Sequence, residues 1–130
     1  MQGTVVEWLD GYRAAWEQRD PDAAAALFAE NAIYREQPYT DGFRGRAGVR
    51  DYWVRVTATQ EDVRLRYGTP VSDGRRAAVE WWVTMRNQGA DITLAGEFLL
   101  LFNDAGLCSE LREYWHFSEG HLAPPDGWGA

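Results

Sequence analysis

The second half of the chain contains three long segments in which apolar and polar residues alternate, residues 75–87, 91–102 and 107–118. Side chains of a β-strand point alternately to the two faces of a sheet, so this pattern predicts three strands. Short turns separate the segments, Gln88-Gly89 and residues 103–106. Because tight turns join antiparallel neighbours, an antiparallel meander is the main constraint on the fold.

The first half of the chain carries the periodicity of helices. Apolar residues at spacings of three and four lie on one face of a helix. The clearest stripe predicts a helix over residues 4–18 and consists of Val5, Leu9, Tyr12 and Trp16. Two more helices are expected over residues 23–30 and 46–61, the former ended by Asn31, with strands over residues 32–37 and 63–72. Helices followed by antiparallel strands indicate an α+β fold whose helices cover one face of the sheet.

The length of 130 residues suits one domain, which we expect to span residues 1–118. Residues 119–130 are rich in Gly and Pro and are expected to form an irregular tail. The N-terminal residues lack the basic and apolar segments of a signal peptide. No apolar run approaches the roughly 18 residues of a membrane span. We therefore expect a cytoplasmic protein without membrane contact.

Charge and cysteine content exclude several function classes. The net charge is −7, and all 13 basic residues are Arg, which argues against a nucleic-acid partner and against lysine Schiff-base chemistry. The single cysteine, Cys108, is expected on the polar side of its strand and forms neither an intrachain disulfide nor a cysteine zinc site. With only two His, neither a metal nor another cofactor is expected.

Alternation also assigns the faces of the predicted sheet. Segments 75–87 and 91–102 each have one apolar face, which we place inward, and the matching face of the last segment contains Leu111, Glu113 and Trp115. Burial between apolar neighbours disfavours a charged carboxylate and raises its pKa by up to roughly 3–5 units, as in a general acid or base. The alternative is a structural carboxylate neutralised by an Arg, for which the inward face has no obvious candidate.

Seven Trp in 130 residues are enough either to fill a core or to line a cavity for an apolar ligand. We expect a cavity with Tyr34 and Glu113 in its wall. The side chains expected to bind a small hydrophobic molecule there are Tyr12, Trp16, Trp81, Met85, Phe98 and Trp115.

The opposite face of the predicted sheet is also partly apolar. It carries Trp82, Leu99, Leu101 and Tyr114 among charged residues. Monomers rarely leave such a patch in water, so we expect a homodimer through this outer face. The alternative is that the C-terminal tail folds over it.

Six stretches carry a resemblance to a known family, residues 12–16, 26–32, 45–53, 79–81, 94–96 and 111–115. They resemble the nuclear transport factor 2-like superfamily in its SnoaL-like branch, with polyketide cyclases, ketosteroid isomerases and limonene-epoxide hydrolases. The resemblance covers about residues 5–117. It implies a cone-shaped, curved antiparallel sheet wrapped around three helices, a cystatin-like α+β roll, with a pocket between the concave face and the first and third helices.

The resemblance also implies site residues. Glu113 matches an acidic position on the last strand that points into the cone, and Tyr34 and Glu36 match pocket positions of the epoxide-hydrolase-like branch. The Arg and Asp used by that branch fall on Trp81 and Val83, so its epoxide chemistry is not implied.

The catalytic residues expected from this comparison are Glu113, Glu36 and Tyr34. Two neighbouring carboxylates resist ionising together and could supply an acid and a base, while Tyr34 could orient a substrate oxygen or stabilise an oxyanion. Glu36 could instead lie at a wet rim or pair with Arg35 or Arg44. The expected function is cofactor-independent isomerisation, cyclisation or dehydration of a small apolar carbonyl compound. The alternative is a non-catalytic protein that binds a hydrophobic ligand.

Overall fold

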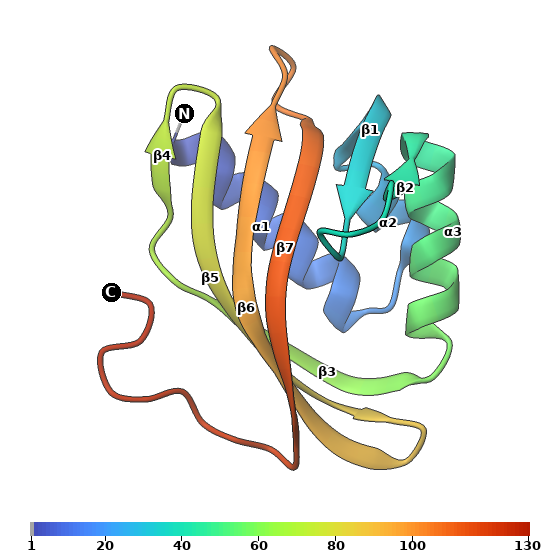
Figure 1. The fold of residues 1–130 in the computed structure, drawn as a ribbon, viewed down its shortest axis with the longest axis vertical. Coiled ribbons are helices and arrows are strands. Elements are labelled where there is room, and N and C mark those ends of the chain that lie inside the picture. Colours follow the sequence, from blue (N-terminus) through green and yellow to red (C-terminus); the bar gives the residue numbers. More distant parts are fainter. Residues whose placement is uncertain (1) are drawn as a thin grey trace.

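Three helices pack against one curved, unclosed sheet in the computed structural model, which describes residues 2–130 (Figure 1). The helices are α1 (Gln2–Glu17), α2 (Pro21–Ala25) and α3 (Gly45–Thr57). The strands are β1 (Phe28–Arg35), β2 (Phe43–Arg44), β3 (Gln60–Tyr67), β4 (Val71–Asp73), β5 (Arg76–Asn87), β6 (Ala90–Phe102) and β7 (Cys108–Glu119). This arrangement confirms the predicted α+β fold.

The sheet has the order β2-β1-β7-β6-β5-β3, and β4 pairs with β5. The long strands β5, β6 and β7 form the predicted antiparallel meander. One pairing departs from the antiparallel expectation, because β1 runs parallel to β7. This pairing places the first strand along the chain beside the last.

The predicted second helix over residues 23–30 is wrong in its C-terminal half. α2 begins after Asp20, whose Oδ1 accepts a hydrogen bond from Ala23 N at 3.0 Å, but it ends at Ala25. Phe28 already belongs to β1 and is fully buried. The Leu27 carbonyl accepts hydrogen bonds from Cys108 N and from the Trp8 indole. Pairing with β7 therefore outweighs the helix propensity of the alanine run, and Asn31 lies inside a strand.

The boundary between α3 and β3 also lies earlier than predicted. α3 ends at Thr57, whose hydroxyl donates to the Trp53 carbonyl at 2.6 Å. β3 starts at Gln60, which lies opposite Asn87 of β5. The expected strand over residues 63–72 is divided into β3 and β4, with Gly68 and Pro70 between them.

A β-bulge in β7 places Cys108 in the core rather than on the polar side of its strand. Leu101 pairs with Glu110 but Phe102 pairs with Cys108, so Ser109 is the extra residue. The shift reverses the alternation upstream of Glu110, and Cys108 is fully buried. Burial raises the pKa of its thiol well above the usual value.

The inward faces of β5 and β6 are apolar, as the alternation predicted. In β5 the side chains of Val79, Trp81, Val83 and Met85 are at most 2% exposed. α1 lies across this face in Figure 1, and its Trp8 and Tyr12 contact Phe102 and Phe98 edge to face. Within residues 2–130, no helix is both long enough and apolar enough to cross a membrane.

The C-terminal segment packs on part of the outer sheet face. The Trp82 indole donates to the Leu122 carbonyl at 2.8 Å and contacts Trp128 edge to face. Trp128 also lies under the Arg66 guanidinium. The tail thus covers Trp82, whereas Tyr114 stays 51% exposed. The homodimer through this face remains a prediction.

Candidate active site

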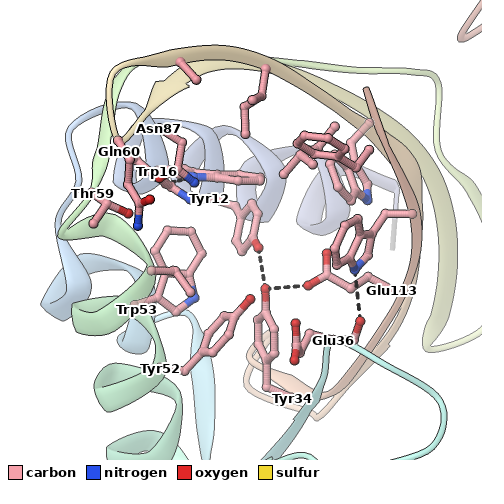
Figure 2. Close-up of a pocket in the computed structure, with 18 residues that line it drawn as sticks. Tyr12, Trp16, Tyr34, Glu36, Tyr52, Trp53, Thr59, Gln60, Asn87 and Glu113 are labelled. Carbon is pink, nitrogen blue, oxygen red and sulfur yellow. Dashed lines mark hydrogen bonds between the residues drawn. The ribbon is translucent and has the colours of Figure 1, made fainter. Parts of the chain in front are cut away.

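A cavity of about 550 Å³ opens between the inward face of the sheet and the helices α1 and α3 (Figure 2). Its lining is mainly apolar and rich in aromatic side chains. Glu113 and Glu36 lie on one side of it, and the side chains of Gln60 and Asn87 lie on the opposite side. The cavity therefore has an apolar middle and two polar ends.

A hydrogen-bonded chain of three side chains forms the first end. The Tyr34 hydroxyl donates to Glu113 Oε1 at 3.0 Å, and the Tyr12 hydroxyl lies 3.0 Å from that of Tyr34 (Figure 2). The parallel pairing of β1 with β7 brings Tyr34 and Glu113 together, because Tyr34 lies opposite Leu111, two residues before Glu113. Since the Tyr34 hydrogen is directed at the carboxylate, Tyr12 donates to Tyr34.

Glu113 is buried without a cation. The residue is only 6% exposed, and none of the ion pairs among residues 2–130 includes it. Burial raises the pKa of Glu113 to about 8, and the charge of Glu36 adds to this rise, whereas the hydrogen bond from Tyr34 opposes it. Near neutral pH this carboxyl group can therefore give up or take up a proton.

Tyr34 and Tyr12 both remain protonated near neutral pH. Burial, followed by the charge of Glu113, raises the pKa of Tyr34 and that of Tyr12 well above the ordinary phenol value. Both hydroxyls therefore act as neutral hydrogen-bond donors toward the carboxylate.

Glu36 directly follows β1, the strand that carries Tyr34. It is half-buried and lines the cavity, and its backbone carbonyl accepts a hydrogen bond from the Trp115 indole at 3.0 Å. Arg35, considered from the sequence as an ion-pair partner of Glu36, pairs with Glu110 instead, with its guanidinium 3.4 Å from that carboxylate. Glu36 thus borders the cavity beside Glu113.

The residues expected to bind a ligand divide into two groups. Tyr12, Trp16, Trp81 and Trp115 line the cavity. Met85 and Phe98 are fully buried but lie outside its lining. Phe98 stacks on Trp81 with ring centroids 5.3 Å apart, so it supports the wall from behind. Alternation identified the inward face but not the part of it that α1 covers.

Helix α3 contributes two aromatic residues that were not assigned to the site from the sequence. The Tyr52 ring lies 5.0 Å from that of Tyr34 and stacks on Phe43. Trp53 contacts Tyr12 edge to face at 5.4 Å. Their helical spacing marked an apolar face, but nothing in it distinguished a cavity wall from core.

The second polar end consists of residues that the sequence did not indicate. Gln60 and Asn87 are paired across β3 and β5, and Gln60 Oε1 accepts a hydrogen bond from the Trp16 indole at 2.8 Å. Next to them, the Gln88 backbone N–H donates to the Thr59 carbonyl at 3.0 Å. Only the pairing of these two strands brings the amide side chains into the cavity.

Three buried side-chain atoms lack a hydrogen-bond partner in the described part of the chain, and all three belong to residues that line this cavity. They are Trp53 Nε1, Trp81 Nε1 and Asn87 Oδ1. Native proteins pair most of their buried polar atoms, so unpaired ones concentrated around a cavity indicate groups for a ligand to satisfy.

No group of three or more His, Cys, Asp or Glu side chains is arranged to hold a metal ion within residues 2–130.

The family is shown by sequence comparison. The family model described as the SnoaL-like domain matches residues 9–111. The chain belongs to the SnoaL-like family. The matched part of this SnoaL-like protein includes Tyr12, Tyr34 and Trp81 and ends two residues before Glu113. None of the curated proteins matches the sequence.

Solved structures show the same fold at low sequence identity. A hypothetical protein with a ketosteroid isomerase-like fold from Catenulispora acidiphila, in complex with trimethylamine, is 21% identical and has a TM-score of 0.75, with 83% of this chain and 84% of that chain covered. The epoxide hydrolase/cyclase-like enzyme SalBIII, of pyran ring formation in salinomycin, is 22% identical with a TM-score of 0.74, covering 85% and 88%. Δ5-3-Ketosteroid isomerase from a Mycobacterium species is 21% identical with a TM-score of 0.73, covering 88% and 98%.

Proposed function

We propose that this SnoaL-like protein is a cofactor-independent enzyme that moves a proton on a small, mainly apolar carbonyl compound. The observation that carries the proposal is the environment of Glu113, which is buried, hydrogen-bonded to Tyr34 and free of any cationic partner among the described residues. A protein that only enclosed an apolar ligand would have little need for such a carboxylate, because burying its charge costs stability.

In the proposed reaction the ionised Glu113 removes a proton from the carbon next to the substrate carbonyl. The C–H bond breaks, an O–H bond forms on Glu113, and the electron pair moves into an enolate. Returning the proton to a different carbon gives isomerisation. Dehydration results when the enolate expels a hydroxyl group from the next carbon, its C–O bond breaks and the proton on Glu113 leaves with it as water. Cyclisation results when the enolate carbon attacks a second carbonyl, whose oxygen then takes the proton from Glu113.

The surrounding side chains would assist this step. Tyr34 and Tyr12 donate along the chain to Glu113 and hold the carboxylate in position. The enolate oxygen requires a donor, and the unpaired Trp53 indole N–H on the cavity wall could supply it. Glu36, at the same end, could exchange the proton with solvent, since it is half-buried.

The reaction class can be tested without the natural substrate. The test compound is a ketone with exchangeable α-protons, a cyclohexanone with a phenyl group on the ring carbon opposite the carbonyl. It would be incubated with the protein in D₂O, and deuterium incorporation would be followed by NMR. We expect catalysed exchange that Glu113→Gln slows by about 10²–10⁴-fold, the usual contribution of a positioned acid or base. The matched control is Glu97→Gln, an exposed carboxylate of β6.

Two outcomes would contradict the proposal. Exchange that persists in Glu113→Gln would place the base elsewhere. Tight binding of the ketone with no catalysed exchange in the parent would instead favour the second function considered, a non-catalytic binder of hydrophobic molecules, which the aromatic lining also suits.

We also propose that the protein forms a homodimer through the outer sheet face. Leu99 and Leu101 are half-buried in the single chain, and Tyr114 is 51% exposed beside them. Size-exclusion chromatography with light scattering should give about twice 14.8 kDa. Leu101→Arg should shift the protein to the monomer, and an unchanged mass in that variant would refute this interface.

A further inference from the structure

The end of the cavity remote from Glu113 has the features of a recognition site. It is formed by Gln60 at the start of β3 and by Asn87 at the end of β5, which lie opposite each other in the sheet. In Figure 2 these two amides face the cavity together with Thr59, across from Glu113.

The hydrogen bonds of the two amides are incomplete in complementary ways. Gln60 uses Oε1 to accept from Trp16, which leaves its amide N–H groups as donors. Asn87 Oδ1 is shielded from solvent and has no donor among the described residues. A hydroxyl group can donate and accept at once, so it would satisfy both amides.

We propose that the cavity selects an elongated, mainly apolar molecule that is polar at both ends. The carbonyl end lies at Glu113, which rests on the function proposed above, and a hydroxyl group at the other end donates to Asn87 and accepts from Gln60. The aromatic side chains between the ends, such as Trp16 and Trp81, pack against the apolar skeleton.

The physical basis is the cost of an unpaired buried polar atom. A ligand without the remote hydroxyl group leaves Asn87 Oδ1, a buried acceptor, without a donor. Sites that hydrogen-bond a substrate hydroxyl reject analogues that lack it, because their own polar groups then remain unsatisfied. Asn87 and Gln60 would therefore determine specificity without taking part in the proton transfer.

The test uses matched ketones that differ only in the remote hydroxyl group. One pair is the cyclohexanone with a phenyl group on the ring carbon opposite the carbonyl and the same ketone with a para-hydroxyphenyl group there. The longer pair is androstanone with and without a hydroxyl group at the far end of its ring system. Dissociation constants would be measured by quenching of tryptophan fluorescence. In at least one pair we expect the hydroxylated ketone to bind about five- to tenfold more tightly, as one added hydrogen bond gives.

Two substitutions connect this preference to Asn87. Asn87→Ala removes the amide, and Asn87→Leu replaces it with an apolar side chain of similar volume; thermal melts show that each variant is folded. Both should lower the ratio of the two dissociation constants, because only the hydrogen bond from Gln60 then remains for the hydroxyl group. Glu97→Gln, on the outer face, should retain the ratio of the parent.

The outcomes separate this inference from the proposed function. A parent without a hydroxyl preference in either pair, or a preference that is undiminished by either Asn87 substitution, would overturn the inference alone. A preference that depends on Asn87, combined with exchange that does not depend on Glu113, would support the inference and contradict the proposed base. Failure of all four ketones to bind would overturn both.

Discussion

Two carboxylates on β7, three residues apart, lie in opposite environments. Glu110 faces outward and lies between two guanidinium groups, 2.6 Å from Arg112 and 3.4 Å from Arg35. Glu113 faces the cavity, has a phenol as its hydrogen-bond donor and has no cation beside it. Arginines are thus present on β7 itself and on the neighbouring β1, yet they neutralise the outer carboxylate. A carboxylate buried without a cation costs stability, and this contrast supports the proton transfer proposed at Glu113.

The largest expected difference between the two carboxylates is the sign of their effect on stability. The pKa of Glu113 is about 8 in the folded protein and about 4.3 for an ordinary Glu in the unfolded chain. The folded state therefore binds the proton more tightly. The contribution of this proton binding to the free energy of unfolding is fully present below about pH 4 and is lost as the pH rises to about 8. The loss is several kcal/mol, up to about 5.

Glu113→Gln removes this titration, so the variant should be more stable than the parent at pH 8, and the difference should shrink toward pH 5. Urea unfolding at several pH values measures it. A Gln variant that is strongly destabilised above pH 6 would mean that Glu113 is a structural carboxylate with a partner that needs its charge.

The second prediction concerns Glu110. Glu110→Gln breaks its ion pairs with Arg112 and Arg35 and should destabilise the protein by about 1–3 kcal/mol near pH 7, since its side chain is only 18% exposed. The same urea measurements test this value. Because Glu110 lies outside the cavity, the deuterium exchange of ketones should stay close to the parental rate. A large loss of exchange in this variant would erase the contrast between the two carboxylates.

The third and smallest effect is a change in pH dependence. The hydrogen bond from Tyr34 lowers the pKa of Glu113, so Tyr34→Phe should raise that pKa above about 8. The pH at which the exchange rate reaches half of its maximum should move upward by the same amount. Tyr39→Phe, at a residue 93% exposed, is the control. An unchanged or lowered midpoint in Tyr34→Phe would show that this hydrogen bond does not stabilise the ionised carboxylate.

Two departures of the structure from the predicted elements share one origin. The alanine run after Asp20 favours a helix, yet Phe28 joins β1 because β7 offers it a strand partner. Cys108 was assigned to the polar side because strict alternation was carried through a bulge. Both outcomes depend on strands that are distant in the sequence, whereas propensity and alternation describe only neighbours along the chain.

The sequence by itself determined the α+β fold, the inward faces of β5 and β6, and the orientation of Glu113 toward the helices, because a strand has a period of two wherever it pairs. The tertiary structure decided which inward residues border empty space. It placed Phe98 behind Trp81, brought Tyr34 to Glu113 through a parallel pairing, and set Asn87 beside Gln60 at the far end of the cavity. Those placements follow from register and from the position of α1 over the sheet, which are set by the packing of the whole chain.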